Sequence, residues 1–380
     1  MKNYKLAIDA TYNLSGGSKT QLINMLSFFK KIDGIDLVVY FSHKNNYLSK
    51  DLDKNNIQII TKRFIGLPRI IRLLWLQFIL PLSLIKNRID VLFCPGNISP
   101  ILTTVKTVQW IGTIGPFFPE FYKGFNLFNR GALYINKLIM ISSSYMANAV
   151  IFESEFTKKL FVNKYRIKKD KTHVINIGND SFYKRIKDNS ELDKKFKKFI
   201  PYALCVSHLY PYKNILNMLD AYKISMNKTG IKLKLLIAGS RDYKYYDIKI
   251  LKKIDELILN DHVTLLGNVS KEELRYLYSN SEMMIFPSPF ENFAYTLVEA
   301  MKCGSPIICS NTTAMPETCK DAALYFDPYN INDMAEKISK VIFDESLKES
   351  MIKKSLDRAN QIPDYNEVTI RTLKIIEAQV

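Results

Sequence analysis

Short runs of apolar residues alternate with longer stretches of helical periodicity along most of the chain. In the first half the apolar runs lie at 6–8, 37–41, 91–93, 107–110, 150–152 and 173–176. In the second half they lie at 202–207, 232–238, 263–266, 283–286 and 306–309. Helical patterns fill the intervals, for example at 19–31, 214–226, 247–260, 271–279 and 293–302. Buried strands that alternate with helices are typical of a parallel sheet covered on both faces, so we predict an α/β fold with two successive doubly wound units.

The alternation is interrupted by a charged segment between about 178 and 201. Residues 184–198 contain few apolar positions, which is typical of a linker or of a solvated helix between domains. This predicts a first domain over 1–182 and a second domain over 183–363, with a C-terminal helix at about 364–380 that crosses back to the first domain. Ligands of such sheets bind beyond the carboxyl ends of the strands, so the cleft between two such domains is the expected site.

The charge balance narrows the classes of partner. Among 380 residues there are 54 Lys and Arg against 37 Asp and Glu, a formal net charge of +17. A chain this basic is attracted to nucleic acid, to an anionic membrane or to phosphorylated small molecules. Its lysines are dispersed, and no recognition helix, zinc finger or RNP-type pattern is present. A basic nucleic-acid-binding protein without enzymatic activity therefore stays an alternative that rests on charge alone.

Several classes of site and location are disfavoured. The five cysteines form no CxxC pair and the four histidines are scattered, which argues against a disulfide framework and against a zinc site. Asp51 and Asp53 lie in a charged stretch that reads as a solvated loop rather than a metal site. No signal-peptide pattern opens the sequence, and the apolar run at 73–85 is too short to cross a bilayer, so we expect a cytoplasmic location.

Gly16 and Gly17 are the glycine pair nearest the N-terminus, directly before a helical pattern. Glycines there allow backbone N–H groups to approach a phosphate at a helix N-terminus, although a plain strand-to-helix turn explains them equally. The fingerprints GxGxxG and GxxxxGK[ST] are both absent, so ordinary dinucleotide and P-loop sites are not indicated.

Glu291 and Glu299 carry the strongest local signal. A strand ends before Glu291, a helix is expected to open near Phe293, and Glu299 follows at a separation of ~12 Å along such a helix. Carboxylates this far apart do not share one proton transfer, but each can accept hydrogen bonds from hydroxyls of one extended ligand. The helix N-terminus between them favours an anion. A nucleotide-sugar satisfies this arrangement; the alternative is an acidic cap followed by a surface glutamate.

Ser207 and His208 begin the loop that follows the first strand of the second domain, and Lys213 lies near the end of the same loop. A lysine in this position can neutralise a leaving diphosphate. The alternative is a solvated surface charge, since most lysines are exposed.

Together these features resemble the retaining glycosyltransferases of family 4. Glu291 and Glu299 match the E-x7-E motif of that family, and residues 300–308 and 316–328 resemble its continuation. Lys213 matches the donor-phosphate lysine, Gly16 and Gly17 match the N-terminal glycine loop, and 150–159 and 174–180 resemble further segments of the family. The sequence departs from the family at His208, where many members have arginine. It departs again at Gln109 and Trp110, where many have a His–Asp pair.

The resemblance implies the GT-B fold, in which two Rossmann-like domains face each other across a cleft. It implies transfer of a sugar, with retention, from a UDP-, GDP- or TDP-linked donor to an acceptor hydroxyl. The acceptor expected is a lipid-linked glycan in the synthesis of a surface polysaccharide such as O-antigen or capsule. The expected catalytic residues are Lys213 and Glu291, and no cofactor or metal is required. The expected donor-binding residues are Gly16, Gly17, Ser207, His208, Lys213, Gly239, Asn268, Val269, Glu291, Asn292, Phe293, Ala294 and Glu299.

Two further questions stay open at this point. A soluble GT-B relative, such as a sugar synthase or an epimerase, fits the same motifs. Residues 62–75 mix basic and large apolar side chains, which suits a segment that rests on an anionic membrane beside a lipid-linked acceptor. A buried helix with basic ends is the alternative. We therefore expect the protein in the cytoplasm, either free or attached peripherally to the inner face of the plasma membrane.

Overall fold

The computed structural model describes residues 3–12, 16–43, 45, 57–62, 69–186, 190–230 and 233–380. Asp51 and Asp53, and residues 63–68 of the basic apolar segment, lie outside the described residues. The chain forms two compact units. The first unit contains residues 1–117, 125–178 and 363–380, and the second contains 118–124 and 179–362.

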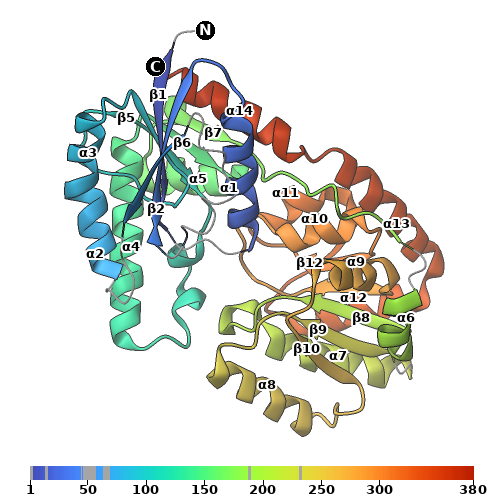
Figure 1. Ribbon diagram of the computed structural model, residues 1–380. Coiled ribbons are helices and arrows are strands. Elements are labelled where there is room, and N and C mark those ends of the chain that lie inside the picture. The colour runs from blue at the N-terminus through green and yellow to red at the C-terminus, as the bar shows by residue number, and fades with distance from the viewer. Residues whose placement is uncertain are drawn as a thin grey trace. The chain divides into compact units, whose positions relative to one another are not determined.

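The first unit is built on a parallel sheet of seven strands in the order β3-β2-β1-β4-β5-β6-β7 (Figure 1). Its strands are β1 (Tyr4–Ala10), β2 (Ile35–Ser42), β3 (Ile57–Lys62), β4 (Val91–Cys94), β5 (Lys106–Ile111), β6 (Ala149–Phe152) and β7 (Thr172–Val174). Its longer helical segments are α1 (Gly16–Phe29), α2 (Arg69–Leu74), the π-helix η2 (Trp75–Ile79), α3 (Leu80–Lys86), α4 (Leu127–Met146) and α14 (Tyr365–Glu377). Shorter ones are η3 (Gly115–Phe117), α5 (Glu155–Lys159), η5 (Leu160–Lys164) and η6 (Lys169–Lys171).

Alternation along β1 explains how this sheet is covered. Leu6 and Ile8 point into a core that α1 and α14 close. Asp9 points to the opposite face, where α2 contributes its ion-pair partner Arg72. Successive side chains of a strand point to opposite faces, so α2, η2, α3 and α4 cover the second face of the sheet, as Figure 1 shows.

The second unit contains a parallel sheet of six strands in the order β10-β9-β8-β11-β12-β13. The strands are β8 (Tyr202–Val206), β9 (Lys234–Ala238), β10 (Val263–Gly267), β11 (Met283–Phe286), β12 (Ile307–Ser310) and β13 (Ala323–Phe326). The longer helices are α6 (Ser190–Phe196), α7 (Ile215–Thr229), α8 (Lys244–Glu256), α9 (Lys271–Asn280), α10 (Tyr295–Lys302), α12 (Ile331–Phe343) and α13 (Glu345–Asn360). The shorter ones are η4 (Pro119–Tyr122), η7 (Lys197–Phe199), η8 (Pro211–Lys213), α11 (Met315–Cys319) and η9 (Lys320–Ala322).

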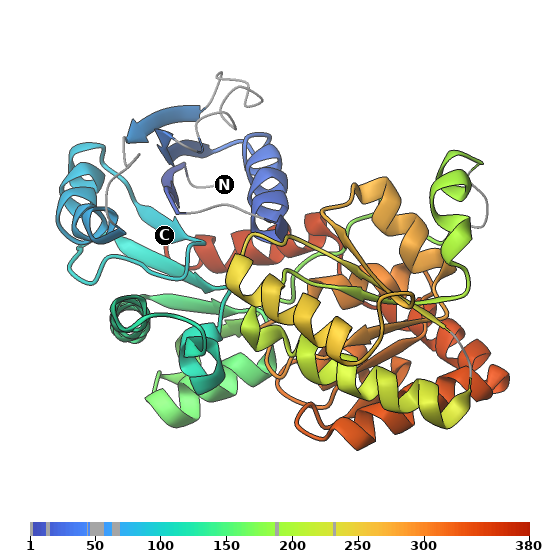
Figure 2. The ribbon, with the colours of Figure 1, turned by 90° about the horizontal axis from the view of Figure 1, so that it is seen from below.

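Helices also cover both faces of this sheet. Apolar residues of α7, α8 and α12 form one core with the strands, and Figure 2 shows the yellow α8 beside the yellow-green α7. On the other face α10 packs against α9 and α13. The charged stretch expected as a linker or solvated helix contains α6 and η7. The two doubly wound units expected from the sequence are thus present.

The chain passes from the first unit to the second at 178/179 and returns at 362/363. The sequence pattern places these passages at 182/183 and 363/364. The structure also assigns residues 118–124 to the second unit, although they follow β5 of the first unit. Nothing in the hydrophobic pattern indicates that segment's placement.

Backbone hydrogen bonds tie together the loops at the carboxyl ends of three neighbouring strands. The N–H of Ser207 donates to the carbonyl of Ala238 (2.9 Å), and the N–H of Gly239 donates to the carbonyl of Gly267 (2.8 Å). A Cβ added at Gly239 would lie 2.0 Å from the carbonyl oxygen of Ser207, and its φ is +143°. Only glycine fits at position 239, since both the space and the backbone conformation exclude a side chain.

We therefore expect Gly239→Ala to destabilise the protein far more than Gly230→Ala. Gly230 also has a positive φ (+68°) but nothing within 4 Å of an added Cβ. Left-handed strain alone costs about 1–2 kcal/mol, and a clash with backbone adds roughly 1–3 kcal/mol at position 239. Urea unfolding of both variants measures the difference. Equal losses of stability would show that the loops tolerate the side chain.

Candidate functional site

In the second unit, the order in which the chain adds strands to the sheet reverses between β8 and β11. From β8 the chain builds outward to β9 and β10, and it then returns to β11 on the other side of β8. Ligands of open parallel sheets bind where the carboxyl ends of strands diverge in this way. Lys213 follows β8 and Glu291 follows β11, so the two strands at the switch point deliver both expected catalytic side chains.

The loop after β8 is fixed by Asn214, the residue that follows Lys213. Asn214 adopts a left-handed conformation (φ 62°), which asparagine tolerates better than most residues. Its side-chain amide donates to the carbonyls of Pro328 (2.7 Å) and Pro287 (3.2 Å). Because Pro287 begins the loop after β11, this amide binds the two loops of the switch point together.

Lys213 and Glu291 form an ion pair at this point, with Nζ 2.5 Å from Oε1. Their side chains are only 15% and 19% exposed. Glu291 is held from the other side, since its N–H donates to the hydroxyl of Thr313 (3.0 Å). Burial lowers the pKa of Lys213, but the Glu291 carboxylate outweighs this effect and the net pKa is raised. The ammonium is therefore charged throughout the physiological range.

Glu299 lies in a different environment. The helix α10 begins at Tyr295, two residues later than expected, so Glu299 belongs to its second turn. Tyr278 donates its hydroxyl to Oε2 (3.1 Å). Burial raises the pKa of Glu299 to about 7, although hydrogen bonds from Tyr278 and Tyr183 lower it in part. This carboxyl group is thus close to half-ionised at neutral pH.

The remaining expected donor-site residues of the second unit line the same edge of the sheet. Ser207 is buried after β8, and His208 beside it is exposed. Partial desolvation and the Lys213 ammonium lower the pKa of His208, so its imidazole is neutral at pH 7. Gly239 follows β9, and Asn268 and Val269 follow β10. Asn292, Phe293 and Ala294 are buried in the loop between β11 and α10.

Gly16 and Gly17 belong to the first unit, where they begin α1. Sequence reasoning missed four residues that shape the second-unit site: Asn214, Thr313, Tyr183 and Tyr278. Asn214 had a detectable signal, because an asparagine directly after a loop lysine and before a helix suggests a left-handed position. The others come from distant segments, and nothing local marks them.

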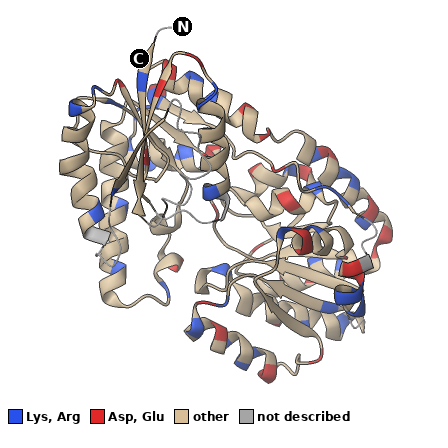
Figure 3. Ribbon diagram, viewed as in Figure 1, with Lys and Arg blue, Asp and Glu red and all other residues tan. Residues whose placement is uncertain are grey.

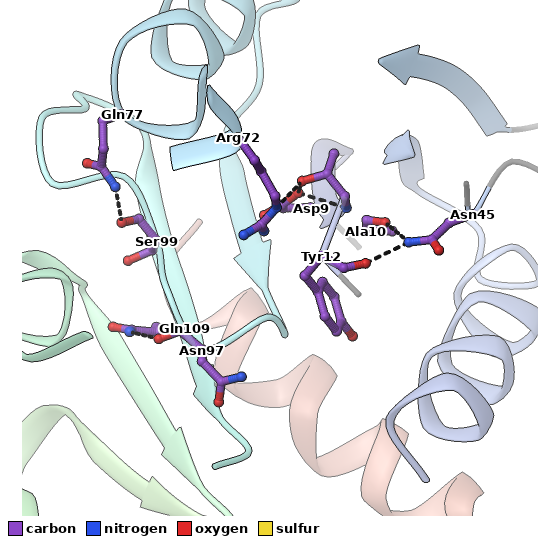
Figure 4. A network of polar contacts seen from close by, with 10 residues as sticks. Asp9, Ala10, Tyr12, Asn45, Arg72, Gln77, Asn97, Ser99 and Gln109 are labelled. Atoms are coloured by element: carbon purple, nitrogen blue, oxygen red, sulfur yellow. Dashed lines mark hydrogen bonds and ion pairs between the residues drawn. The ribbon is translucent and has the colours of Figure 1, made fainter. Parts of the chain in front are cut away.

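A polar cluster occupies the corresponding switch point of the first unit, between β1 and β4 (Figure 4). Asp9 is fully buried, and its Oδ2 lies 3.0 Å from Nη2 of Arg72. Its Oδ1 accepts hydrogen bonds from the N–H and the hydroxyl of Thr11 (3.0 and 2.5 Å). Arg72 also donates from Nε to that hydroxyl (3.0 Å). The carboxylate and guanidinium are therefore fixed at the carboxyl end of β1.

Gln109 and Trp110 occupy structural positions in β5. Gln109 donates to the carbonyl of Asn97 (2.7 Å) and to the hydroxyl of Ser143 on α4 (2.9 Å). Trp110 is buried in the core on the opposite face, and its indole N–H donates to Glu153 (3.0 Å). These hydrogen bonds connect β5 to Asn97, to α4 and to Glu153.

Two kinds of feature are absent from the described part of the chain. No three His, Cys, Asp or Glu side chains gather there in a way that would hold a metal ion. No helix there has both the length and the apolar character that a bilayer-spanning segment requires.

Comparison with known proteins adds to this geometry. Residues 184–358 match the family described as glycosyl transferases group 1, and this range includes Lys213, Glu291 and Glu299. This part of the chain is thus similar to that family. The chain is 31% identical over 172 residues to the O-antigen chain mannosyltransferase B of Escherichia coli, covering 45% of this chain and 44% of that protein. It is 28% identical over 242 residues to the capsular polysaccharide biosynthesis glycosyltransferase CapM of Staphylococcus aureus, covering 61% and 60%. The matched region thus spans about half the length of these curated relatives.

Solved structures of glycosyltransferases match the chain along its whole length. A glycosyltransferase from Rickettsia africae superposes with a TM-score of 0.76 at 19% identity, covering 100% of this chain and 99% of that one. HepE of Anabaena, solved in complex with UDP and glucose, gives 0.76 at 17% identity and covers 99% and 100%. The expected GT-B fold is confirmed, with the group 1 glycosyl transferase match in its second unit.

The raised pKa of Glu299 predicts how stability depends on pH. The folded protein holds this proton up to about pH 7, whereas the unfolded chain releases it near the ordinary value of 4.5. Between these values the folded state binds more protons, so its free energy of unfolding falls as pH rises, by up to about 3 kcal/mol. Glu299→Gln removes this contribution. Urea unfolding of both proteins at pH 5, 6, 7 and 8 tests it, and parallel pH curves would contradict the assignment.

Proposed function

We propose that this protein is a retaining glycosyltransferase that moves a sugar from a nucleoside-diphosphate donor to an acceptor hydroxyl. The observation that carries the proposal is the Lys213–Glu291 pair, which lies at the switch point of the group 1 glycosyl transferase unit. A fixed ammonium at a diphosphate site stabilises the charge that develops as the sugar leaves. Glu291, held by Lys213 and Thr313, is placed to accept hydrogen bonds from hydroxyls of the donor sugar.

In the proposed reaction the bond between the anomeric carbon and the diphosphate oxygen breaks, and a bond to the acceptor oxygen forms on the same face of the sugar. The acceptor proton passes to the departing phosphate oxygen. Lys213 stabilises that leaving group, so the protein supplies positioning and electrostatics rather than a nucleophile. On this proposal the reaction needs no metal or other cofactor.

Glu299 is proposed to bind the ribose of the donor. Two ribose hydroxyls that donate to its carboxylate would favour the ionised form over the protonated one. Donor binding would then lower the pKa of Glu299 from about 7 and release a proton. The tyrosines at positions 183 and 278 hold the carboxylate in place for this contact.

The names of similar proteins support the proposed substrate class. Two of the relatives act in O-antigen and capsular polysaccharide synthesis, one of them as a mannosyltransferase, and HepE binds UDP. We therefore propose a lipid-linked glycan of a surface polysaccharide as the acceptor. GDP-mannose and UDP-glucose are the donors to test first, with TDP-sugars next.

A thermal-shift screen against UDP, GDP, TDP and their sugars tests the donor site. We expect one nucleotide to raise the melting temperature of the wild type, and both Lys213→Ala and Glu299→Ala to reduce that shift. Lys353→Ala, an exposed lysine of α13, is the matched control. In a transfer assay, Lys213→Ala should lower kcat about 10²–10³-fold, as loss of one preorganised charge-stabilising donor does. EDTA should leave the wild-type rate unchanged.

Two results of the thermal-shift screen would contradict the proposal. If no nucleotide shifts the wild type, with or without added lipid, the proposal is wrong. A shift that survives in Lys213→Ala would place the diphosphate elsewhere.

We also propose that the first unit rests on an anionic membrane. From 71 to 85, every exposed residue is apolar: Leu74, Phe78, Ile79, Leu82 and Ile85. No acidic residue occurs between 69 and 89, whereas Arg72, Lys86 and Arg88 are basic. An exposed apolar helix face flanked by cations fits the boundary between acyl chains and anionic headgroups.

The helix α4 offers a second surface of the same kind. Leu127 and Phe128 at its start are each 84% exposed, and Tyr134, Ile135 and Leu138 continue the exposed apolar face. No acidic residue occurs from 121 to 152, while Arg130 and Lys137 are basic. In Figure 3, α2, α3 and α4 are almost entirely tan with a few blue turns. Both surfaces lie on the face of the sheet that carries the Asp9–Arg72 cluster.

Vesicle co-sedimentation tests this membrane proposal. Binding to vesicles rich in phosphatidylglycerol should exceed binding to phosphatidylcholine vesicles and should weaken as salt rises. Phe78→Asp and Phe128→Asp should each reduce binding at least about tenfold, since burying a phenylalanine gives about 1.5–3 kcal/mol. Phe343→Asp, an exposed position in the second unit, is the control. Binding that ignores lipid charge, or a stable dimer formed through these helices, would overturn the proposal.

A further inference from the structure

Four aromatic rings form a continuous stack in the second unit. Phe118 lies on Phe290 with centroids 4.8 Å apart and planes inclined by 6°. Phe290 lies on Tyr212 (5.3 Å, 19°), and Tyr212 lies on Tyr210 (5.7 Å, 7°). Near-parallel rings at these spacings stabilise one another beyond the effect of the area they bury.

The middle rings of the stack are the chain neighbours of the ion pair. Tyr212 directly precedes Lys213, and Phe290 directly precedes Glu291. The ammonium of Lys213 also lies 5.2 Å from the centroid of the Tyr212 ring. A shift of either ring therefore moves the backbone that carries one of the two charges.

Phe118, the ring at one end of the stack, comes from residues 118–124, which we call the strap. The strap leaves the first unit after η3 and returns to it before α4. It also touches the loop that carries Lys213, at two places. Phe121 packs on Tyr212 with centroids 5.1 Å apart. A Cβ on Gly124 would lie 2.9 Å from the ring of Pro211, the first residue of η8.

The end of the strap is also pinned. The hydroxyl of Tyr243 donates to the carbonyl of Gly124. The φ of Gly124 is +88°, so glycine suits both the conformation and the close approach of Pro211. The strap is thus held at Phe118, Phe121 and Gly124.

We propose that the strap is a positioning element for Lys213 and Glu291, acting through the stack of Phe118, Phe290, Tyr212 and Tyr210. This inference rests on the proposed function for its catalytic consequence. Its geometric core, that Phe118 and Phe121 hold the Lys213–Glu291 pair together, does not. The strap belongs to the segment between β5 and α4, so residues outside the matched family region set the geometry of the donor-site charges.

The test compares Phe118→Leu, which removes the ring, with Phe118→Tyr, which keeps it. Phe343→Leu makes the same change at an exposed position of the same unit. Acetylation of lysines, followed by peptide mass spectrometry, reports how well Lys213 is protected. In the wild type Lys213 should react slowly. Phe118→Leu should raise its labelling rate, up to about tenfold for each pKa unit lost when the pair loosens, because only the unprotonated amine reacts.

Lys253 serves as an internal standard in each sample. It pairs with Asp220 at 2.7 Å in the same unit and is remote in sequence from the strap. Its labelling rate should be the same in every variant that is folded. Phe118→Tyr and Phe343→Leu should leave both lysines at their wild-type rates.

The catalytic arm uses the transfer assay on the same proteins. A misplacement of catalytic groups by about 1 Å costs on the order of 10²-fold, so Phe118→Leu should lower kcat about 10–100-fold with little change in donor KM. Phe118→Tyr should restore kcat. A merely structural role would lower the melting temperature and leave kcat unchanged below it.

The outcomes separate the two proposals. Equal Lys213 labelling in the wild type and Phe118→Leu would overturn the role of the strap, whatever the activity. A wild type that transfers no sugar while Phe118→Leu still exposes Lys213 would overturn the proposed function and leave the positioning role standing. Loss of kcat in Phe118→Leu without faster labelling would also refute positioning through the ion pair.

Discussion

The ion pair between Lys213 and Glu291 is the constraint on which the second unit depends most. Two charges with little exposed surface are stable only when each faces the other and has further polar support. The support comes from Thr313 for Glu291 and from Asn214, whose amide joins the two loops that carry the pair. The switch point of the sheet is therefore occupied by a preorganised charge pair. Such a pair costs no further ordering when an anion arrives.

The parallel sheet explains how so few residues build this edge. All strands end on the same side, so loops distant in sequence become neighbours without long connections. Hydrogen bonds from Ser207 to Ala238 and from Gly239 to Gly267 then lock three of these loops at backbone level. These particular contacts use backbone atoms only, so they hold the loops without occupying side chains. Position 239 lies so close to the backbone of Ser207 that it has no room for a side chain.

The sequence predicts the buried strands well, because β1, β8 and β11 are short apolar runs bounded by turns. It does not reveal β3 or β13, which lie at sheet edges and contain half-buried positions, so neither full burial nor strict alternation marks them. Local motifs locate Lys213, Glu291 and Glu299. The tyrosines around Glu299 and the strap escape sequence reasoning, since their roles arise only from contacts between distant segments. Helix α10 starts at Tyr295 instead of 293 because the loop that presents Glu291 extends through Ala294.

The segment α2-η2-α3 is apolar on its outward side as well as on its buried side, where Trp75, Leu76, Leu80 and Leu84 pack. Its inward side also makes polar contacts: Arg72 pairs with Asp9, Gln77 binds the backbone of Ser99, and Ser83 shares a hydrogen bond with Tyr40. Its outward side from 71 to 85 is apolar. A helix that faces water usually carries polar residues on its outward side. On the membrane proposal an apolar surface covers this outward side, and the cations at its ends, with no acidic residue among them, suit an anionic lipid surface. On the same proposal this segment would contact lipid with its outward side, while its inward side holds Arg72 against Asp9 at the carboxyl end of β1.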